Sequence, residues 1–177
     1  LEEMGYELPL TEDRFAGHFV RTVQTGNLVY LAGHGAWVPE GGFLHMGKLG
    51  SDLTIEQGYE CARLTALNML ASLKEHLGDL DRVKQVVKML CMINCDPDFK
   101  DAPLVANGAS DLLVSLYGGA GRHARSAVDM SSLPFSIPIE IDERAAVRST
   151  PSRIYAAPEC QDFQFEREWQ ARFHRFY

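Results

Sequence analysis

Arg125 and Glu140 are the side chains with the clearest potential for chemistry, because they belong to two predicted strands that a short connection joins. If residues 124–130 and 137–142 close as a symmetric hairpin, Ala127 lies opposite Glu140 and Arg125 is its diagonal neighbour, about 7–8 Å away. A guanidinium can hold a carboxylate through two hydrogen bonds while a carboxylate moves a proton or orients water. The arrangement would suit a small carboxylic acid, although spacing alone favours a surface ion pair across the hairpin.

Histidines and cysteines give weaker signals. His123 shares a face with Arg125 only if that strand starts early, and a loop histidine is the favoured interpretation. His34 and His18 could line a cleft, but packed or solvated histidines fit equally well. The four cysteines form no Cys-x-x-Cys pair and no zinc-finger spacing. We therefore interpret them as packing thiols in a reducing cytoplasm, and we expect no metal site and no cofactor.

Two helices are predicted to position these side chains. Thr54 and Gln57 form a capping box, apolar residues then recur at helical spacing, and Gly78 follows where a helix commonly ends. Leu104–Tyr117 predicts a second helix that Gly118 and the glycine after it stop.

Strands precede and follow these helices. Phe19–Thr25 and Leu28–Gly33 predict a hairpin around Gly26 and Asn27, and the valine-rich segment Val83–Cys95 predicts a long strand. With the two strands near residue 130, the order predicts an α+β fold: a mixed sheet with two helices on one face.

Charge and length exclude several classes of protein. The 177 residues are 46% hydrophobic, which fits one domain, and 17 Lys and Arg against 24 Asp and Glu give a net charge of −7. Nucleic acids and anionic membranes need a basic surface, so we expect neither as a partner. The best apolar run, Leu64–Leu73, is too short to span a bilayer. Leu1–Tyr6 lacks the features of a signal peptide, and because Leu1 is not a methionine we expect residues ahead of it.

Several motifs together resemble one family. Arg125–Pro134 (RSAVDMSSLP) followed by Ile139–Asp142 (IEID) resembles the C-terminal signature of the RidA (YjgF) family, the small enamine/imine deaminases also labelled endoribonuclease L-PSP. Thr25–Gly33 (TGNLVYLAG) is similar to the first hairpin of that family. Further segments resemble a less-characterised branch of it, namely residues 47–54, 107–113 and 121–126. The resemblance covers about residues 19 to 145.

The resemblance implies a chorismate-mutase-like fold and a homotrimer with clefts between subunits. It implies that Arg125 holds the substrate carboxylate, that Glu140 is linked to the hydrolytic water, and that Asn107 lies near the cleft. The chain also departs from the family pattern. Phe19 stands where deaminases usually have a tyrosine, and Ala127 stands where many have a cysteine, so only its backbone groups remain for a ligand.

One further departure lies after the second strand, where Gly33 and His34 replace the family's usual Gly-Gln pair and alter the polarity of the expected pocket. The leading hypothesis is a hydrolytic deaminase of small 2-imino or 2-enamino carboxylic acids at a subunit-interface cleft. The alternative is a regulatory trimer that binds a small carboxylate through Arg125 without turnover, and the missing tyrosine and cysteine favour it. A ribonuclease is the least attractive hypothesis, because the net charge is −7 and no basic aromatic groove is evident.

The chain is expected to comprise three parts: an irregular lead-in over residues 1–18, a RidA-like domain over 19–147 and a C-terminal extension over 148–177. Large aromatic residues recur at helical spacing near the end of the extension. They predict a helix from about Gln161 to Phe176 that docks on the trimer.

Overall fold

The computed structural model describes residues 1, 5–9, 18–39 and 41–148. Within them, five strands form one sheet in the order β1-β2-β5-β3-β4. The strands are β1 (Thr22–Thr25), β2 (Leu28–His34), β3 (Val83–Asn94), β4 (Ala124–Met130) and β5 (Ile139–Val147). Neighbouring strands pair antiparallel except β3 and β4, which are parallel. The predicted mixed sheet is therefore confirmed.

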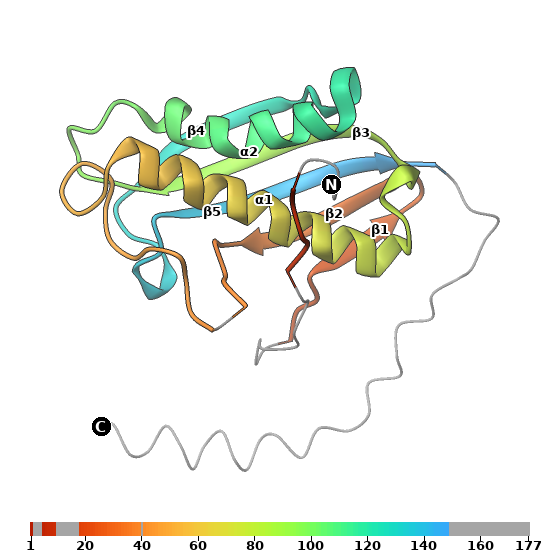
Figure 1. The fold of residues 1–177 in the computed structure, drawn as a ribbon, viewed down its shortest axis with the longest axis horizontal. Coiled ribbons are helices and arrows are strands. Elements are labelled where there is room, and N and C mark those ends of the chain that lie inside the picture. The colour runs from red at the N-terminus through yellow and green to blue at the C-terminus, as the bar shows by residue number, and fades with distance from the viewer. Residues whose placement is uncertain (2–4, 10–17, 40, 149–177) are drawn as a thin grey trace, which may run out of the picture.

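Both predicted helices are present and lie side by side across the same face of the sheet (Figure 1). Helix α1 (Ile55–Leu77) begins with the predicted capping box, in which the Thr54 hydroxyl accepts from the Gln57 N–H and the Gln57 side chain accepts from the Thr54 N–H. Helix α2 (Ala102–Tyr117) ends at a glycine with φ of 57°. Single turns of 3₁₀ helix complete the described elements: η2 (Leu80–Arg82), η3 (Gly118–Gly121) and η4 (Pro134–Ser136).

The β1–β2 hairpin also follows the prediction, since Thr25 pairs with Leu28 and the two-residue turn contains a glycine with φ of 56°. The two ends differ, because β1 begins at Thr22 rather than at Phe19 and β2 ends at His34 rather than at Gly33. Strand β5 starts after Pro138 and is longer than predicted. Pro138 has no N–H to donate, but its carbonyl accepts from the Asn94 N–H at 2.9 Å.

The predicted hairpin between β4 and β5 is wrong. Strand β3 lies between them, paired in parallel with β4 on one side and antiparallel with β5 on the other. The reason is the crossover through α2: a parallel pair needs such a connection, and it places β4 at the sheet edge. The chain then crosses to the other side of β3, where β5 fills the space beside β2.

The hydrophobic core lies between the sheet and the two helices. Alternate residues of β3 and β5 point into it, including the fully buried Met89, Ile93, Ile139 and Ile141. The residues between them point to the other face of the sheet, which neither helix covers. Among the residues described, no helix has the length and apolar character needed to cross a bilayer.

Candidate functional site

Arg125 lies on the edge strand β4 and points toward α2. It is paired with Met89, which is fully buried beneath the helices, so both side chains occupy the helix-covered face of the sheet. One terminal nitrogen, Nη1, donates to the Asn107 side-chain oxygen at 2.9 Å and to the Ser110 hydroxyl at 2.8 Å. The other, Nη2, donates to the Pro103 carbonyl oxygen at 3.2 Å. The start and middle of α2 therefore hold this guanidinium in place.

The partners of Arg125 are all neutral. No carboxylate oxygen lies within 4.0 Å of its guanidinium in the part of the chain that the structure describes. A guanidinium has five N–H donors, and the three bonds leave Nε–H and one hydrogen of Nη2 without an acceptor among those residues. This is a fixed cation whose charge is not neutralised, which is the arrangement that an incoming carboxylate requires.

Asn107 was predicted near the cleft, and the structure places it in direct contact with Arg125. Ala127 lies two residues along β4 on the same face, half-buried and opposite Cys91. The sequence reasoning missed Ser110. The signal was present, because Asn107 and Ser110 are three residues apart on one helix and such residues share a face.

His123 lies in the loop just before β4, as predicted, but it also contacts the residues that hold Arg125. Its Nε2 lies 3.1 Å from the Ser110 hydroxyl and its Nδ1 lies 2.7 Å from the Gly121 carbonyl oxygen. Burial lowers the pKa of His123, opposed by the Gly121 hydrogen bond and assisted by the nearby positive charge of Arg125. We call Arg125, Asn107, Ser110 and His123 the arginine cluster.

Glu140 lies on the opposite face of the sheet. Its neighbours Ile139 and Ile141 are fully buried beneath the helices, so the Glu140 side chain points to the uncovered face. There it lies over Gly33, where a Cβ atom would be only 2.8 Å from the Glu140 carboxyl carbon. Burial, and then repulsion from Asp142, raises the pKa of Glu140.

The expected proximity of Arg125 and Glu140 is therefore wrong for a single chain. Strand β3 separates their strands, and the two side chains occupy opposite faces of the sheet. The error follows from the hairpin pairing assumed from the short connection, which would have made β4 and β5 direct neighbours.

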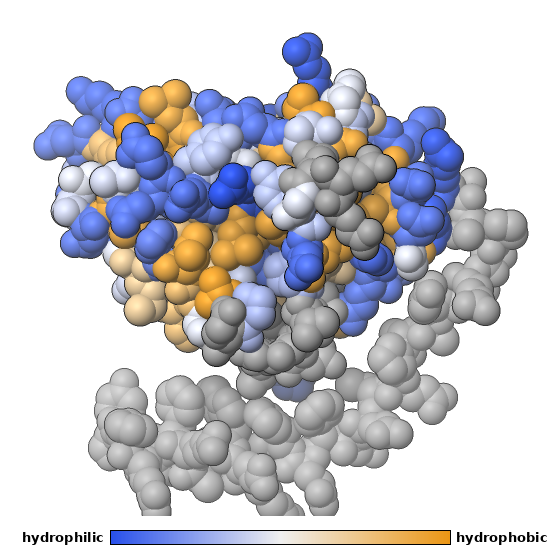
Figure 2. Space-filling model, viewed as in Figure 1, coloured by the Kyte–Doolittle hydropathy of each residue, from blue (hydrophilic) through white to orange (hydrophobic). Residues whose placement is uncertain are grey.

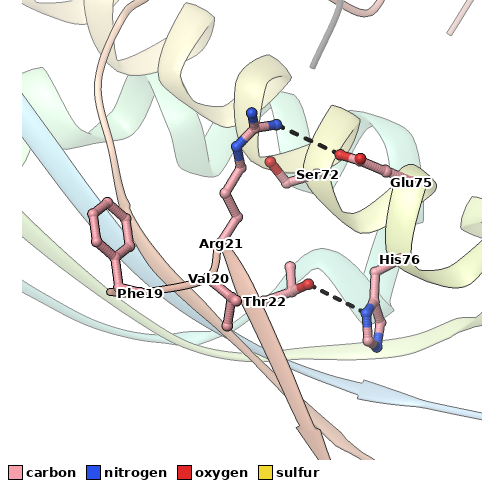
Figure 3. Close-up of a pocket in the computed structure, with 7 residues that line it drawn as sticks. All are labelled: Phe19, Val20, Arg21, Thr22, Ser72, Glu75 and His76. Atoms are coloured by element: carbon pink, nitrogen blue, oxygen red, sulfur yellow. Dashed lines mark hydrogen bonds and ion pairs between the residues drawn. The ribbon is translucent and has the colours of Figure 1, made fainter. Parts of the chain in front are cut away.

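Phe19 lies at the other edge of the sheet, beside a pocket of about 280 Å³ between the start of β1 and the end of α1 (Figure 3). The pocket lining comprises Phe19, Val20, Arg21, Thr22, Ser72, Glu75 and His76. Figure 3 places Phe19 on the opposite side of the pocket from His76. Phe19 is 55% exposed.

His34 is packed behind this pocket rather than exposed in it. Its Nε2 lies 2.8 Å from the hydroxyl of the buried Ser72, and its Nδ1 lies 2.6 Å from the Ala32 carbonyl oxygen. Because a carbonyl can only accept, Nδ1 carries the hydrogen. Burial lowers the pKa of His34, so the ring is neutral at pH 7 and contributes no charge to the pocket.

The cysteines that the structure describes are free and buried, which supports the interpretation as packing residues. Burial raises the pKa of Cys61 and of Cys91 to about 12, so neither thiol ionises near neutral pH. Over the described ranges, no group of three or more His, Cys, Asp or Glu side chains is arranged to hold a metal ion.

Comparison with known proteins identifies the family of the chain. Residues 4–138 match the family model described as "YjgF/chorismate_mutase-like, putative endoribonuclease". Protein TCP17 of Trypanosoma cruzi is 40% identical over 143 residues, which cover 80% of this chain and 88% of that protein.

Solved structures support the same family. Protein Atu1372 of Agrobacterium tumefaciens has a TM-score of 0.75 at 35% identity, covering 82% of this chain and 88% of its own. An endoribonuclease-like protein of Shewanella oneidensis has a TM-score of 0.77 at 30% identity, covering 82% of this chain and 95% of that protein. E. coli TdcF with bound serine shares the fold, with a TM-score of 0.53 at 22% identity over 80% and 94% of the two chains. The chain belongs to the YjgF/chorismate mutase-like family, which its motifs predicted.

Proposed function

We propose that this protein binds small 2-imino or 2-enamino carboxylic acids at a site shared between the subunits of a trimer, and that it hydrolyses their C=N bond. The observation that carries the proposal is the state of Arg125. Three neutral acceptors hold its guanidinium, and no carboxylate among the described residues neutralises it. Serine, the ligand of the TdcF structure, likewise carries a carboxylate.

The positions of the site residues favour a shared site. Arg125 lies at the β4 edge of the sheet and Phe19 precedes the β1 strand at the other edge. Four strand spacings of about 4.8 Å separate these edges by about 19 Å, too far for one small ligand. In a head-to-tail ring, one edge of each subunit meets the opposite edge of the next. Such a ring would bring Phe19 of one subunit toward Arg125 of its neighbour. We infer that Glu140, which lies on the central strand β5, faces the same shared site from the uncovered face of the sheet.

Exposed apolar side chains support an assembly. Figure 2 shows apolar residues gathered below α1, over the loops that follow β2 and β4. Exposed side chains in these loops include Met46, at 62%, and Phe135, at 74%, whose ring stacks on Phe43 with centroids 5.9 Å apart. The uncovered sheet face adds Tyr30 and Val128. Burying such groups against a second copy is favourable by roughly 1.5–3 kcal/mol for each large side chain.

The chemistry needs little from the protein beyond positioning. The substrate carboxylate would bind Arg125, and a water molecule would add its oxygen to the C=N carbon while Glu140 accepts a proton. Returning that proton to the nitrogen gives a carbinolamine, which carries a hydroxyl and an amino group on the same carbon. Transfer of the hydroxyl proton to the nitrogen, again through Glu140, forms the C=O bond as the C–N bond breaks, so the products are ammonia and a 2-oxo acid. The raised pKa of Glu140 suits a group that must first accept and then donate a proton.

The test measures hydrolysis of 2-iminopropanoate that an amino acid oxidase forms in situ from alanine, after subtraction of spontaneous hydrolysis. We expect Arg125→Ala and Glu140→Gln to remove the protein-dependent rate. Arg122→Ala, which removes the same charge from an exposed position three residues away, should leave it unchanged. Equal rates for Arg125→Ala and wild type would refute the proposal. If wild type binds pyruvate through Arg125 without turnover, the regulatory alternative is correct.

Co-expression of the two inactive variants tests whether the site is shared. In a ring where each site takes Arg125 from one subunit and Glu140 from the next, random mixing rebuilds about a quarter of the sites. We therefore expect about a quarter of the wild-type rate from the mixture, and a mass of three chains by light scattering. No recovery of activity would place both residues in the same subunit's site, and a monodisperse monomer would rule out the ring.

A further inference from the structure

We infer that Ser110 and His123 are positioning residues that set the orientation of the Arg125 guanidinium for carboxylate binding. The inference rests on the proposed function, because it concerns the same arginine. Neither residue has been given a role by the family resemblance, and both lie in the segments that resemble its less-characterised branch. The structure brings those two segments together at one point, where Ser110 of α2 contacts both His123 and Arg125.

The Ser110–His123 hydrogen bond can run in only one direction when His123 is neutral, and at 3.1 Å it is shorter than the 3.5 Å contact of the same hydroxyl with the Ala106 carbonyl oxygen. The Gly121 carbonyl can only accept, so the His123 Nδ1 carries the hydrogen and its Nε2 must accept. The Ser110 hydroxyl is therefore the donor to Nε2. A guanidinium can only donate, so the same hydroxyl oxygen accepts from Arg125 Nη1. The chain of donors runs from Arg125 through Ser110 to His123.

This direction has a consequence for Arg125. A hydroxyl that donates to an imidazole is a stronger acceptor, because successive hydrogen bonds polarise one another. Ser110 and Asn107 use both hydrogens of Nη1, so the plane of the guanidinium is fixed from one end. Its remaining donors, Nε–H and one Nη2–H, are then held in one orientation before any ligand arrives. Arranging the donors in advance reduces the entropy that binding must overcome.

A merely structural role would predict a different result. If these bonds only tied α2 to β4, losing Ser110 would lower stability and leave ligand affinity unchanged. A positioning role predicts the reverse: a loss of affinity with little change in melting temperature. Ser115 provides a matched control, because it lies on the same helix and its hydroxyl donates only to the Leu112 carbonyl, at 2.7 Å, among the described partners.

Calorimetry with pyruvate as the probe separates these roles. We expect Ser110→Ala to weaken pyruvate binding by about tenfold, since it removes one of the hydrogen bonds that hold a charged group. Ser110→Thr, which keeps the hydroxyl, should restore most of the affinity. Ser115→Ala should bind like wild type and melt like Ser110→Ala. In the Arg125→Lys background, which lacks the planar fork, adding Ser110→Ala should change the affinity by less than about twofold.

Each outcome has a distinct meaning. If Arg125→Ala loses pyruvate binding while Ser110→Ala matches Ser115→Ala, the positioning role is wrong and the proposed function stands. If Arg125→Ala binds pyruvate like wild type, the proposed function itself fails. Nitrogen NMR of His123 gives a check without any ligand: we expect hydrogen on Nδ1 and an unprotonated Nε2 at neutral pH. Hydrogen on Nε2 instead would overturn the donor direction on which the inference depends.

Discussion

Replacing Gly108 by alanine should destabilise the protein by forcing α1 and α2 apart. A Cβ atom at this position would lie 2.9 Å from the Tyr59 carbonyl carbon and 3.1 Å from the Arg63 backbone nitrogen, and nearer still to the Tyr59 carbonyl oxygen. These are backbone atoms of α1, so no side-chain rotation can relieve the overlap. The contact with the carbonyl oxygen is the shortest, so the helices must separate by at least about 1 Å to reach ordinary contact distances of 3.5–4.0 Å.

The size of the effect follows from two opposing contributions. A gap of about 0.5–1 Å forfeits a quarter to a half of the dispersion energy across the contact, and overpacking a core costs about 1–3 kcal/mol or more. Alanine is a better helix former than glycine by about 1 kcal/mol, which offsets part of the loss. We therefore expect the free energy of unfolding to fall by about 2 kcal/mol, and the melting temperature by about 4–8 °C.

Urea denaturation and thermal melting of Gly108→Ala measure this change. Gly119→Ala is the matched control, because no atom of the described residues, apart from Gly119 itself and its two chain neighbours, lies within 4 Å of the position where its Cβ would be. That control should stay within about 0.5 kcal/mol of wild type. Because Gly108 follows Asn107, the variant should also bind pyruvate more weakly than the control. A free energy of unfolding for Gly108→Ala equal to that of Gly119→Ala would refute the close packing of the two helices at this point.

Three further changes probe the site, the core and the C-terminal extension. Gly33→Ala should displace the flexible Glu140 side chain and lower the rate of hydrolysis toward that of Glu140→Gln. Stability and pyruvate affinity should change little. A wild-type rate in this variant would contradict the position of Glu140 over Gly33. Glu143 is fully buried and its carboxyl has no hydrogen-bond partner among the described residues, and burial raises its pKa from 4.5 to about 8. The folded state therefore holds a proton that the unfolded state releases. The free energy of unfolding should decrease as the pH rises from about 4.5 to about 8, by up to about 1.4 kcal/mol per pH unit. The urea midpoint of Glu143→Gln should lack this pH dependence. A pH dependence equal to that of wild type would refute the role of Glu143. The predicted docked helix near the C-terminus lies outside the described residues. Deleting residues 159–177 should lower the melting temperature or weaken assembly while pyruvate still binds. A truncated protein that melts and assembles like the full chain would refute the docked helix.

The predictions that succeeded depend on local interactions. The capping box at Thr54, the glycine after Leu77 and the two-residue turn between β1 and β2 each involve residues only a few positions apart. Their geometry is decided by backbone preferences and short-range hydrogen bonds, which the residue types reveal directly. The alternation of apolar and polar residues along β5 is equally local, and it agrees with the burial of Ile139 and Ile141 and with a Glu140 side chain that faces away from the core.

The composition of the site was decided by contacts between distant segments. Asn107 and Arg125 meet because α2 crosses over the sheet before β4, and Gly33 lies beneath Glu140 because β2 pairs with β5.

By itself, the sequence determined the family, the limits of α1, the turn of the first hairpin and the residue types that could bind a carboxylate. Only the tertiary structure decided that β3 separates β4 from β5, and thus that Arg125 and Glu140 face opposite sides of the sheet. The physical reason is that a strand's side-chain alternation defines its two faces but not its neighbours. Neighbours depend on how the whole chain buries its apolar surface, which no short segment specifies.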